Sequence, residues 1–228
     1  QSELARAAHD RAAEAAEAAQ RVADDAATAA EEHAAFARRA QEERRAVEAQ
    51  VLEMAEARRK IVVTGGTSGI GLELVRRLAD RHDILVAGRR ADTDALPVLP
   101  EGVRYVHAPL TDPEAATQAI AEAMLKAGWV KLDNLVLNAG TGFAVEGGIE
   151  SAAQIRETLA VNLTASVLLA RALFPWLEKA GGTLTLVGSV AHTGQGLFPA
   201  YAASKAGLHG LARALRAEWS GRVAVQIV

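Results

Sequence analysis

A tyrosine and a lysine in the last part of the sequence are spaced for acid–base chemistry. Tyr201 and Lys205 are four residues apart, which places both on one face of a predicted helix. A phenol has an ordinary pKa of about 10, and a neighbouring ammonium lowers that pKa because it stabilises the phenolate. The pair could therefore exchange a proton with a substrate oxygen near neutral pH. Taken alone, the same spacing is also typical of an ordinary surface pair.

A serine upstream of this pair adds a hydrogen-bond donor. Ser189 follows the apolar run 183–187, which predicts a buried strand. Its hydroxyl could hold a carbonyl oxygen while Tyr201 protonates that oxygen. Such chemistry reduces a ketone only if a hydride donor is present, so the chain must also bind a dinucleotide.

The stretch 61–71, IVVTGGTSGIG, predicts a strand, a tight turn and the start of a helix. Such a turn directs free backbone N–H groups and the positive end of a helix dipole at one point, which suits a diphosphate. The strand and helix that a dinucleotide fingerprint requires are both present, whereas a glycine-rich loop without a ligand would not need them. The predicted cofactor contacts in this turn are Gly65, Thr67, Ser68, Gly69, Ile70 and Gly71.

Two arginines follow the second predicted strand, 83–88. In a doubly wound sheet, this point lies beside the adenosine ribose of the nucleotide. An acidic residue there would hydrogen-bond the ribose hydroxyls of NAD, but this chain has Arg89 and Arg90. Guanidinium groups suit a 2′-phosphate because they donate paired hydrogen bonds and keep their charge. The sequence therefore predicts NADP(H) in preference to NAD(H), unless both arginines belong to a solvated loop.

The remaining pattern predicts the fold class. Strands at 103–107, 132–137, 183–187 and 222–228 alternate with helices, one of which begins near residue 112 with Thr111 as its cap. Such alternation is typical of an α/β, Rossmann-like doubly wound parallel sheet with helices on both faces. Ligands of these sheets bind outside the carboxyl ends of the strands. Gly65, Arg89, Asn138 and Ser189 all fall at such ends.

Residues 1–59 form a region of different composition. The segment is rich in alanine, with glutamate and arginine interleaved, and it contains neither glycine nor proline. These are strong helix formers, so an all-helical N-terminal arm is predicted. A coiled coil, a helical hairpin, an arm that binds a protein partner and a solvated helix without a partner are all compatible with this pattern.

The overall composition excludes several classes of site. The chain has 228 residues, of which 50% are hydrophobic, and its formal net charge is −3. It contains no cysteine, which excludes disulfides and thiolate metal sites, and we predict no metal site. The charge gives no reason to expect a nucleic-acid partner. No membrane span and a cytoplasmic location are expected, because no apolar run reaches the roughly 20 residues that a bilayer requires.

From about residue 60 onward, the chain resembles the short-chain dehydrogenase/reductase family. The family's cofactor motif, Thr-Gly-x-x-x-Gly-x-Gly, falls on Thr64, Gly65, Gly69 and Gly71, and its Asn-Ala-Gly motif falls on Asn138, Ala139 and Gly140. Its catalytic tetrad falls on Asn162, Ser189, Tyr201 and Lys205.

The resemblance implies a role for each of these positions. Tyr201 would be the general acid/base, and Lys205 would lower its pKa and bind the nicotinamide ribose, so both also contact the cofactor. Ser189 would orient the substrate oxygen, and Asn162 would help hold a water in the proton relay. Asn138, Ala139 and Gly140 would flank the cofactor. Pro109 stands where the family often has an adenine-contacting aspartate, which leaves the Leu110 backbone beside the adenine.

The resemblance covers 60–228 only. It implies that the segment lacks the family's usual last strand and substrate-covering lid, so that the sequence is incomplete, the missing parts come from elsewhere, or they are absent. It also implies a homo-oligomer, a dimer or tetramer formed through the helices predicted over 151–179 and 201–220.

Two functions of different classes are predicted. The first is an NADPH-dependent ketoreductase that interconverts a ketone or aldehyde with an alcohol. The second is an assembly module in which the arm docks a partner and the dehydrogenase fold is a scaffold with weak or no turnover. The intact tetrad favours the enzyme.

Overall fold

The computed structural model describes residues 34–45, 58–143, 150–194, 196 and 198–228. The chain divides into two units, Gln1–Ala57 and Arg58–Val228. In the first unit, residues 34–45 form a helix that is largely exposed, and 74% of the Phe36 side chain is accessible to solvent. The rest of the predicted arm, including any coiled coil or hairpin, lies outside the described residues.

The second unit is built on a parallel sheet in the strand order β3-β2-β1-β4-β5-β6. Neighbouring strands pair in parallel throughout, with β1 in the middle between β2 and β4. The reversal of strand order beside β1 brings the carboxyl ends of β1 and β4 together, where doubly wound sheets bind ligands. The strands are β1 (Lys60–Thr64), β2 (Asp83–Gly88), β3 (Arg104–His107), β4 (Asn134–Leu137), β5 (Thr183–Leu186) and β6 (Ala224–Ile227).

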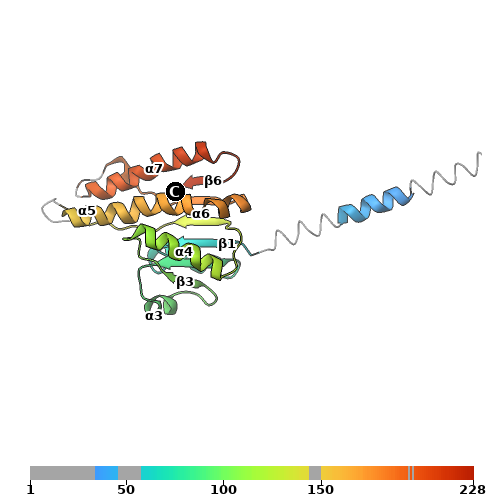
Figure 1. Cartoon of the computed structure of the whole chain (residues 1–228), viewed down its shortest axis with the longest axis horizontal. Coiled ribbons are helices and arrows are strands. Elements are labelled where there is room, and N and C mark those ends of the chain that lie inside the picture. Colours follow the sequence, from blue (N-terminus) through green and yellow to red (C-terminus); the bar gives the residue numbers. More distant parts are fainter. Residues whose placement is uncertain (1–33, 46–57, 144–149, 195, 197) are drawn as a thin grey trace, which may run out of the picture. The chain divides into compact units, whose positions relative to one another are not determined.

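Helices cover both faces of this sheet, as Figure 1 shows for the front layer of α4, α5 and α6. Alternate strand residues face opposite layers. Val62 packs in the larger core with α4, α6 and α7, whereas Ile61 and Val63 pack in the smaller core with α2. The predicted doubly wound α/β fold is therefore confirmed. The helical elements are α2 (Gly69–Leu78), α3 (Asp92–Ala95), η1 (Leu96–Val98), α4 (Pro113–Lys126), α5 (Ala152–Leu159), η2 (Ala160–Thr164), α6 (Ala165–Ala180), η3 (Val190–Thr193) and α7 (Pro199–Glu218).

A π-helical turn, η2, interrupts the long helix between α5 and α6. Such single turns occur frequently at functional sites, and this one carries Asn162. Among the described residues, Ala152–Ala180 is also the one helical stretch long and apolar enough to cross a membrane by length and composition alone. Leu169, Leu173 and Leu177 of this stretch are fully buried in the larger core, and a core helix has the same composition.

The start of α4 differs from the sequence-based expectation. Asp112, not Thr111, is the N-cap residue, and its carboxylate accepts a hydrogen bond of 3.1 Å from the N–H of Ala115. Pro113 occupies the first helical position, where its fixed φ favours the helix and no backbone donor is lost. The proline thus sets the start of the helix one residue later than the threonine would.

Candidate active site

The glycine turn after β1 is fastened to the end of β4. The Oγ1 atom of Thr64 accepts hydrogen bonds of 3.1 Å from the N–H groups of Asn138 and Ala139. In return, the Asn138 amide donates to the carbonyl oxygens of Thr64 and Gly65, both at 3.1 Å. Asn138 therefore links the glycine turn after β1 to the end of β4, beside the point where the strand order reverses.

Three glycines in the turn meet different requirements. A Cβ on Gly71 would lie 2.3 Å from the carbonyl oxygen of Gly65, so only glycine lets α2 pack this close to the turn. Gly65 and Gly69 have φ values of +69° and +54°, which L side chains rarely adopt. A Cβ on Gly69 would meet no atom within 4 Å and would project into open space. The turn has the shape that allows a diphosphate to approach the backbone at a helix N-terminus.

A cleft of about 370 Å³ opens over this turn. Its size and its mixture of backbone and side-chain groups suit the adenosine and diphosphate portion of a dinucleotide. Ten of the fourteen predicted cofactor residues line it. Gly69 and Gly71 are not among the lining residues and instead shape the turn, and Tyr201 and Lys205 do not line this cleft either. The ten are Gly65, Thr67, Ser68, Ile70, Arg89, Arg90, Leu110, Asn138, Ala139 and Gly140.

Lys205 lies deeper, at the far end of the Asn138–Gly140 segment. Its side chain is almost completely buried, with 3% exposed, and its ammonium donates a 2.8 Å hydrogen bond to the carbonyl oxygen of Val187. The same nitrogen is 5.7 Å from the centroid of the Tyr201 ring. Burial lowers the pKa of Lys205 from its ordinary value, because a low-dielectric interior disfavours the charged form.

Tyr201 is half-buried in the first turn of α7. A Cβ on Gly142 would lie 2.9 Å from Cδ2 of the tyrosine ring, so the loop after β4 packs directly on this side chain. The Phe198 ring meets the Tyr201 ring edge-on at 6.5 Å between centroids. These contacts restrict the orientation of the phenol.

Asn162 ties three parts of the site together from the π-helical turn. Its Oδ1 accepts a hydrogen bond of 2.8 Å from the N–H of Thr141, and its Nδ2 donates to the Thr141 carbonyl at 2.9 Å. The same Nδ2 donates to the hydroxyl of Ser204, the residue before Lys205, at 3.0 Å. A Cβ on Gly140 would lie 3.6 Å from both Asn162 Oδ1 and Lys205 Nζ. The amide thus positions the β4 loop against α7.

Ser189 is the N-cap residue of η3. Its Oγ accepts a hydrogen bond of 3.2 Å from the N–H of Ala191, which leaves the hydroxyl hydrogen available for a substrate oxygen. Its carbonyl oxygen lies 2.7 Å from Nδ1 of His192. The hydroxyl and the carbonyl of Ser189 are therefore held by the short helix that follows it. Because Val187 binds Lys205, the end of β5 connects the serine to the lysine.

The comparison with known proteins agrees with this arrangement. The model of the short chain dehydrogenase family matches residues 59–228. The chain belongs to the short-chain dehydrogenase/reductase family. It is 30% identical over 176 residues to an uncharacterized oxidoreductase of Mycobacterium tuberculosis, with 72% of this chain and 69% of that protein covered.

Two further relatives extend the comparison. A 3-oxoacyl-[acyl-carrier-protein] reductase, MabA of Mycobacterium avium, is 34% identical over 168 residues, which cover 71% of this chain and 62% of MabA. The crystal structure of a short-chain dehydrogenase/reductase oxidoreductase from Brucella ovis, in complex with a partially ordered NAD, superposes with a TM-score of 0.66 at 32% identity, over 75% of this chain and 82% of that one. The chain thus spans about two thirds of the length of its curated relatives.

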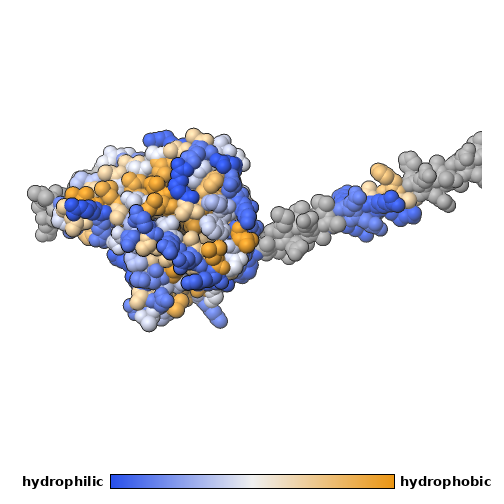
Figure 2. All heavy atoms as spheres, in the orientation of Figure 1, coloured by the Kyte–Doolittle hydropathy of each residue, from blue (hydrophilic) through white to orange (hydrophobic). Residues whose placement is uncertain are grey.

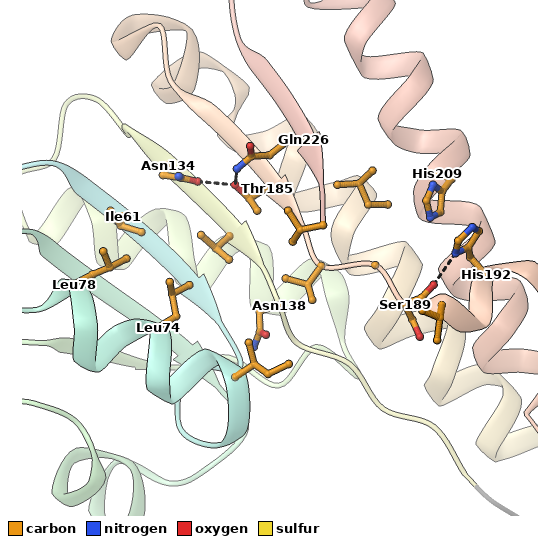
Figure 3. Close-up of a pocket in the computed structure, with 17 residues that line it drawn as sticks. Ile61, Leu74, Leu78, Asn134, Asn138, Thr185, Ser189, His192, His209 and Gln226 are labelled. Carbon is orange, nitrogen blue, oxygen red and sulfur yellow. Dashed lines mark hydrogen bonds between the residues drawn. The ribbon is translucent and has the colours of Figure 1, made fainter.

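A second, mostly apolar cavity of about 750 Å³ adjoins the cofactor cleft of this short-chain dehydrogenase/reductase. Figure 3 shows Leu74 and Leu78 of α2 on one side and His192 and His209 on the other, with the sheet between them. The two histidine rings stack with centroids 4.1 Å apart. Partial burial, then the charges of His192, Arg213 and Arg216, lower the pKa of His209. Ile70 and Asn138 line both cavities, so the two spaces are neighbours.

Sequence reasoning missed several residues that position the site. Thr141 and Ser204 are the partners of Asn162, and Val187 is the partner of Lys205. Glu150 is 7% exposed and accepts a hydrogen bond of 3.1 Å from the N–H of Ala200 at the start of α7. Thr141 and Ser204 stand directly beside the motif residues Gly140 and Lys205, which is a signal that could have indicated them, whereas Glu150 has no such neighbour.

Proposed function

We propose that this protein is an NADP(H)-dependent oxidoreductase that interconverts a ketone or aldehyde with an alcohol. The observation that carries the proposal is the buried Lys205 ammonium, held between the end of β5 and the Tyr201 ring. Burying an ammonium disfavours folding. A catalytic role explains why the charge is kept, because it lies between a phenol and a cofactor cleft. A bound nicotinamide would supply the hydride or accept it.

The protein's own groups would handle the oxygen and the proton. In the reducing direction, the Ser189 hydroxyl donates a hydrogen bond to the substrate carbonyl oxygen, and Tyr201 Oη transfers its proton to the same oxygen as negative charge develops there. In the oxidising direction, the phenolate takes the alcohol proton. The carbon of the substrate gains or loses the hydride, so one proton and one hydride are exchanged in each turnover.

Lys205 and Asn162 would support the proton transfer without reacting themselves. The Lys205 ammonium stabilises negative charge on the Tyr201 oxygen and can hydrogen-bond a ribose hydroxyl of the cofactor. Asn162 holds the loop that packs on Tyr201, through its two hydrogen bonds with Thr141. The water-holding role that the family resemblance implies for Asn162 stays a prediction.

The preference for NADP(H) rests on Arg89 and Arg90. Both arginines are exposed and line the cleft directly after β2, where an adenosine ribose would lie. The titrations that test this compare NADPH and NADH by nicotinamide fluorescence, in the full chain and in an Arg89→Ala/Arg90→Ala variant. We expect the variant to lose roughly tenfold or more in NADPH affinity, since each charge-assisted contact contributes about 1.5–3 kcal/mol, with little change for NADH. Equal affinities in the unmodified chain would refute the preference.

The substrate class is proposed from the apolar residues near Tyr201 and from the relatives. Phe198 packs edge-on to the Tyr201 ring, and Phe143 follows Gly142, which packs on the same ring. Both phenylalanine side chains are partly exposed. Apolar walls suit a fairly hydrophobic ketone. Because MabA is named a 3-oxoacyl-[acyl-carrier-protein] reductase, a 3-oxoacyl thioester is the first ketone to test.

A homo-oligomer, either a dimer or a tetramer, is also proposed. Hydrophobic side chains gather along the band of α5 and α6 on the face in Figure 2. Val161, Leu163, Phe174 and Trp176 are partly buried hydrophobic residues of this stretch. Sedimentation of the full chain tests the proposal, and a monomer at micromolar concentration would refute it. A cytoplasmic location accompanies the proposal.

The scaffold alternative is less well supported, because the relatives are named as oxidoreductases or reductases and the tetrad is intact. A partner for the N-terminal helices stays a prediction. Sedimentation with and without residues 1–57, in the presence of a cell extract, would show whether the arm recruits another protein.

A further inference from the structure

A tyrosine on the edge strand β3 contacts the loop that carries the two arginines. Tyr105 pairs in register with Val86 of β2, and its ring packs against the smaller core. A Cβ on Gly88 would lie 3.1 Å from the Tyr105 oxygen and 3.4 Å from Cε2. The ring therefore rests on the backbone of Gly88, the last residue of β2.

The hydroxyl of Tyr105 extends beyond the end of β2. It donates a hydrogen bond of 2.8 Å to the carbonyl oxygen of Arg90. The loop is also fixed at its two ends, because the Gly88 carbonyl accepts from Ala108 N–H at 2.8 Å and the Ala91 carbonyl accepts from Asp94 N–H at 3.0 Å. The tyrosine hydroxyl thus fastens the middle of the loop, where the two arginines lie.

We propose that Tyr105 is a positioning residue for cofactor selection, whose hydroxyl holds the Arg89–Arg90 loop in the conformation that presents both guanidinium groups to a 2′-phosphate. This inference rests on the proposed NADP(H) preference and extends it to a residue outside the cleft lining. The arginine side chains are exposed and flexible, so their backbone must be fixed if two of them are to meet one phosphate.

The protonation state of Tyr105 is compatible with this role. Burial, followed by the charge of Asp92, raises the pKa of Tyr105, while the charge of Arg90 opposes the shift. The phenol therefore keeps its proton through the neutral range and remains a donor to the carbonyl. The hydroxyl has no role in the chemistry assigned to Tyr201 and Lys205, so cofactor selection can be tested apart from turnover.

Tyr105→Phe is the decisive variant because it removes the hydroxyl and keeps the ring against Gly88 and the core. We expect its NADPH affinity, measured by fluorescence titration of the full chain, to fall about three- to tenfold, the effect of one lost hydrogen bond. NADH affinity should stay within about twofold, because NADH has no 2′-phosphate to meet the loop. The fragments 2′,5′-ADP and 5′-ADP, titrated in the same way, should repeat the difference without a nicotinamide.

Two control variants separate the possible outcomes. Arg90→Ala should show the same selective loss, while Leu110→Ala, which alters the adenine side of the cleft, should weaken both cofactors. An unchanged NADPH affinity in Tyr105→Phe would overturn the inference. An equal loss for NADPH and NADH would also overturn it, since the hydroxyl would then support the fold in general.

A cofactor-free measurement separates this inference from the proposed cofactor preference. Trypsin cleaves after arginine, so a released loop should be cut faster after Arg89 and Arg90 in Tyr105→Phe than in the unmodified chain. If the unmodified chain binds NADPH and NADH equally, the proposed preference is wrong, and the trypsin rates still decide whether the hydroxyl holds the loop. Equal cleavage rates would overturn the positioning role.

Discussion

The Lys205 ammonium donates a 2.8 Å hydrogen bond to the backbone carbonyl of Val187. This contact joins α7, which carries Tyr201, to the end of β5, which leads into Ser189. Among the described residues, the one hydrogen-bond acceptor of this buried ammonium is a neutral carbonyl, an arrangement that disfavours folding. The relationship explains why the fold places a cation where a phenol, a serine and a cofactor cleft meet.

Lys205→Met should separate stability from activity. Methionine fills a similar volume without a charge, so the variant should unfold within about 1 kcal/mol of the unmodified chain at neutral pH, while turnover falls at least about a hundredfold. Urea denaturation and steady-state kinetics measure the two quantities. A variant that keeps its turnover would contradict the role assigned to the lysine.

The pH dependence of stability, compared between the unmodified chain and Lys205→Met, gives a second test of the buried Lys205 ammonium. The pKa of Lys205 is lowered in the folded state from 10.5, so the unfolded chain binds more protons between the two values and stability rises with pH there. The destabilising effect of the buried ammonium is complete below the folded pKa and disappears as pH passes 10.5. The unmodified chain should therefore gain stability relative to Lys205→Met toward alkaline pH, and a constant difference would refute this.

Asn162→Ala should destabilise the domain by about 2–4 kcal/mol, because it leaves a backbone N–H and carbonyl of Thr141 without partners and opens a cavity. Asn162→Asp keeps the acceptor for the Thr141 N–H but sets a second oxygen against the Thr141 carbonyl, so it should not recover the loss. Thermal unfolding followed by circular dichroism measures both variants. Equal melting temperatures for the alanine variant and the unmodified chain would show that the amide is not a brace.

Gly71→Ala should damage the cofactor turn directly. Its Cβ would lie 2.3 Å from the Gly65 carbonyl oxygen and 2.5 Å from the Asn138 amide, so the turn or α2 must shift. We expect a loss of about 1–3 kcal/mol in stability and weaker binding of NADPH and NADH alike. Gly210→Ala is the matched control, because a Cβ there meets nothing within 4 Å. It should stabilise α7 by up to about 1 kcal/mol.

Asp83→Asn tests the ion pairs at the amino end of the sheet. Burial would raise the pKa of Asp83, but hydrogen bonds from Arg58 at 2.8 Å and Lys60 at 3.3 Å outweigh it and leave that pKa below 3.8. Asp83 therefore contributes stability above pH 3.8 that is lost as pH falls through its folded-state pKa. The variant should cost about 1 kcal/mol at neutral pH, and the difference should vanish in acid.

The exposed neighbour Asp80 supplies the control for that experiment. Asp80→Asn removes the same charge three residues earlier and leaves the hydrogen bonds to Asp83 in place, so its loss of stability at neutral pH should be smaller than that of Asp83→Asn. A loss as large as that of Asp83→Asn would show that net charge, and not the pairing with Arg58, is responsible.

The fold could be predicted from the sequence, and candidate catalytic residues could be named, because both rest on local patterns. The glycine turn, the alternating strands and the four-residue spacing of Tyr201 and Lys205 are short-range features. Contacts such as Asn162 with Thr141 and Ser204, or Tyr105 with Arg90, join residues that are 15 or more positions apart. The hydrophobic periodicity of the sequence does not indicate these contacts, since tertiary packing decides which polar groups meet. The predicted cap of α4 was wrong because Thr111 and Asp112 are both residues that cap helices. Pro113 at the first helical position makes Asp112 the N-cap.

The most direct test of the proposed chemistry is isotope transfer. The full chain and Tyr201→Phe would each be incubated with NADPH carrying deuterium at the transferable position and with a 3-oxoacyl thioester, and the alcohol product analysed by mass spectrometry. We predict one deuterium per product molecule with the unmodified chain and a rate reduced at least about a hundredfold in Tyr201→Phe. Equal transfer by both proteins would contradict the role of Tyr201, and tight NADPH binding without transfer to any ketone or aldehyde tested would contradict the proposed reaction.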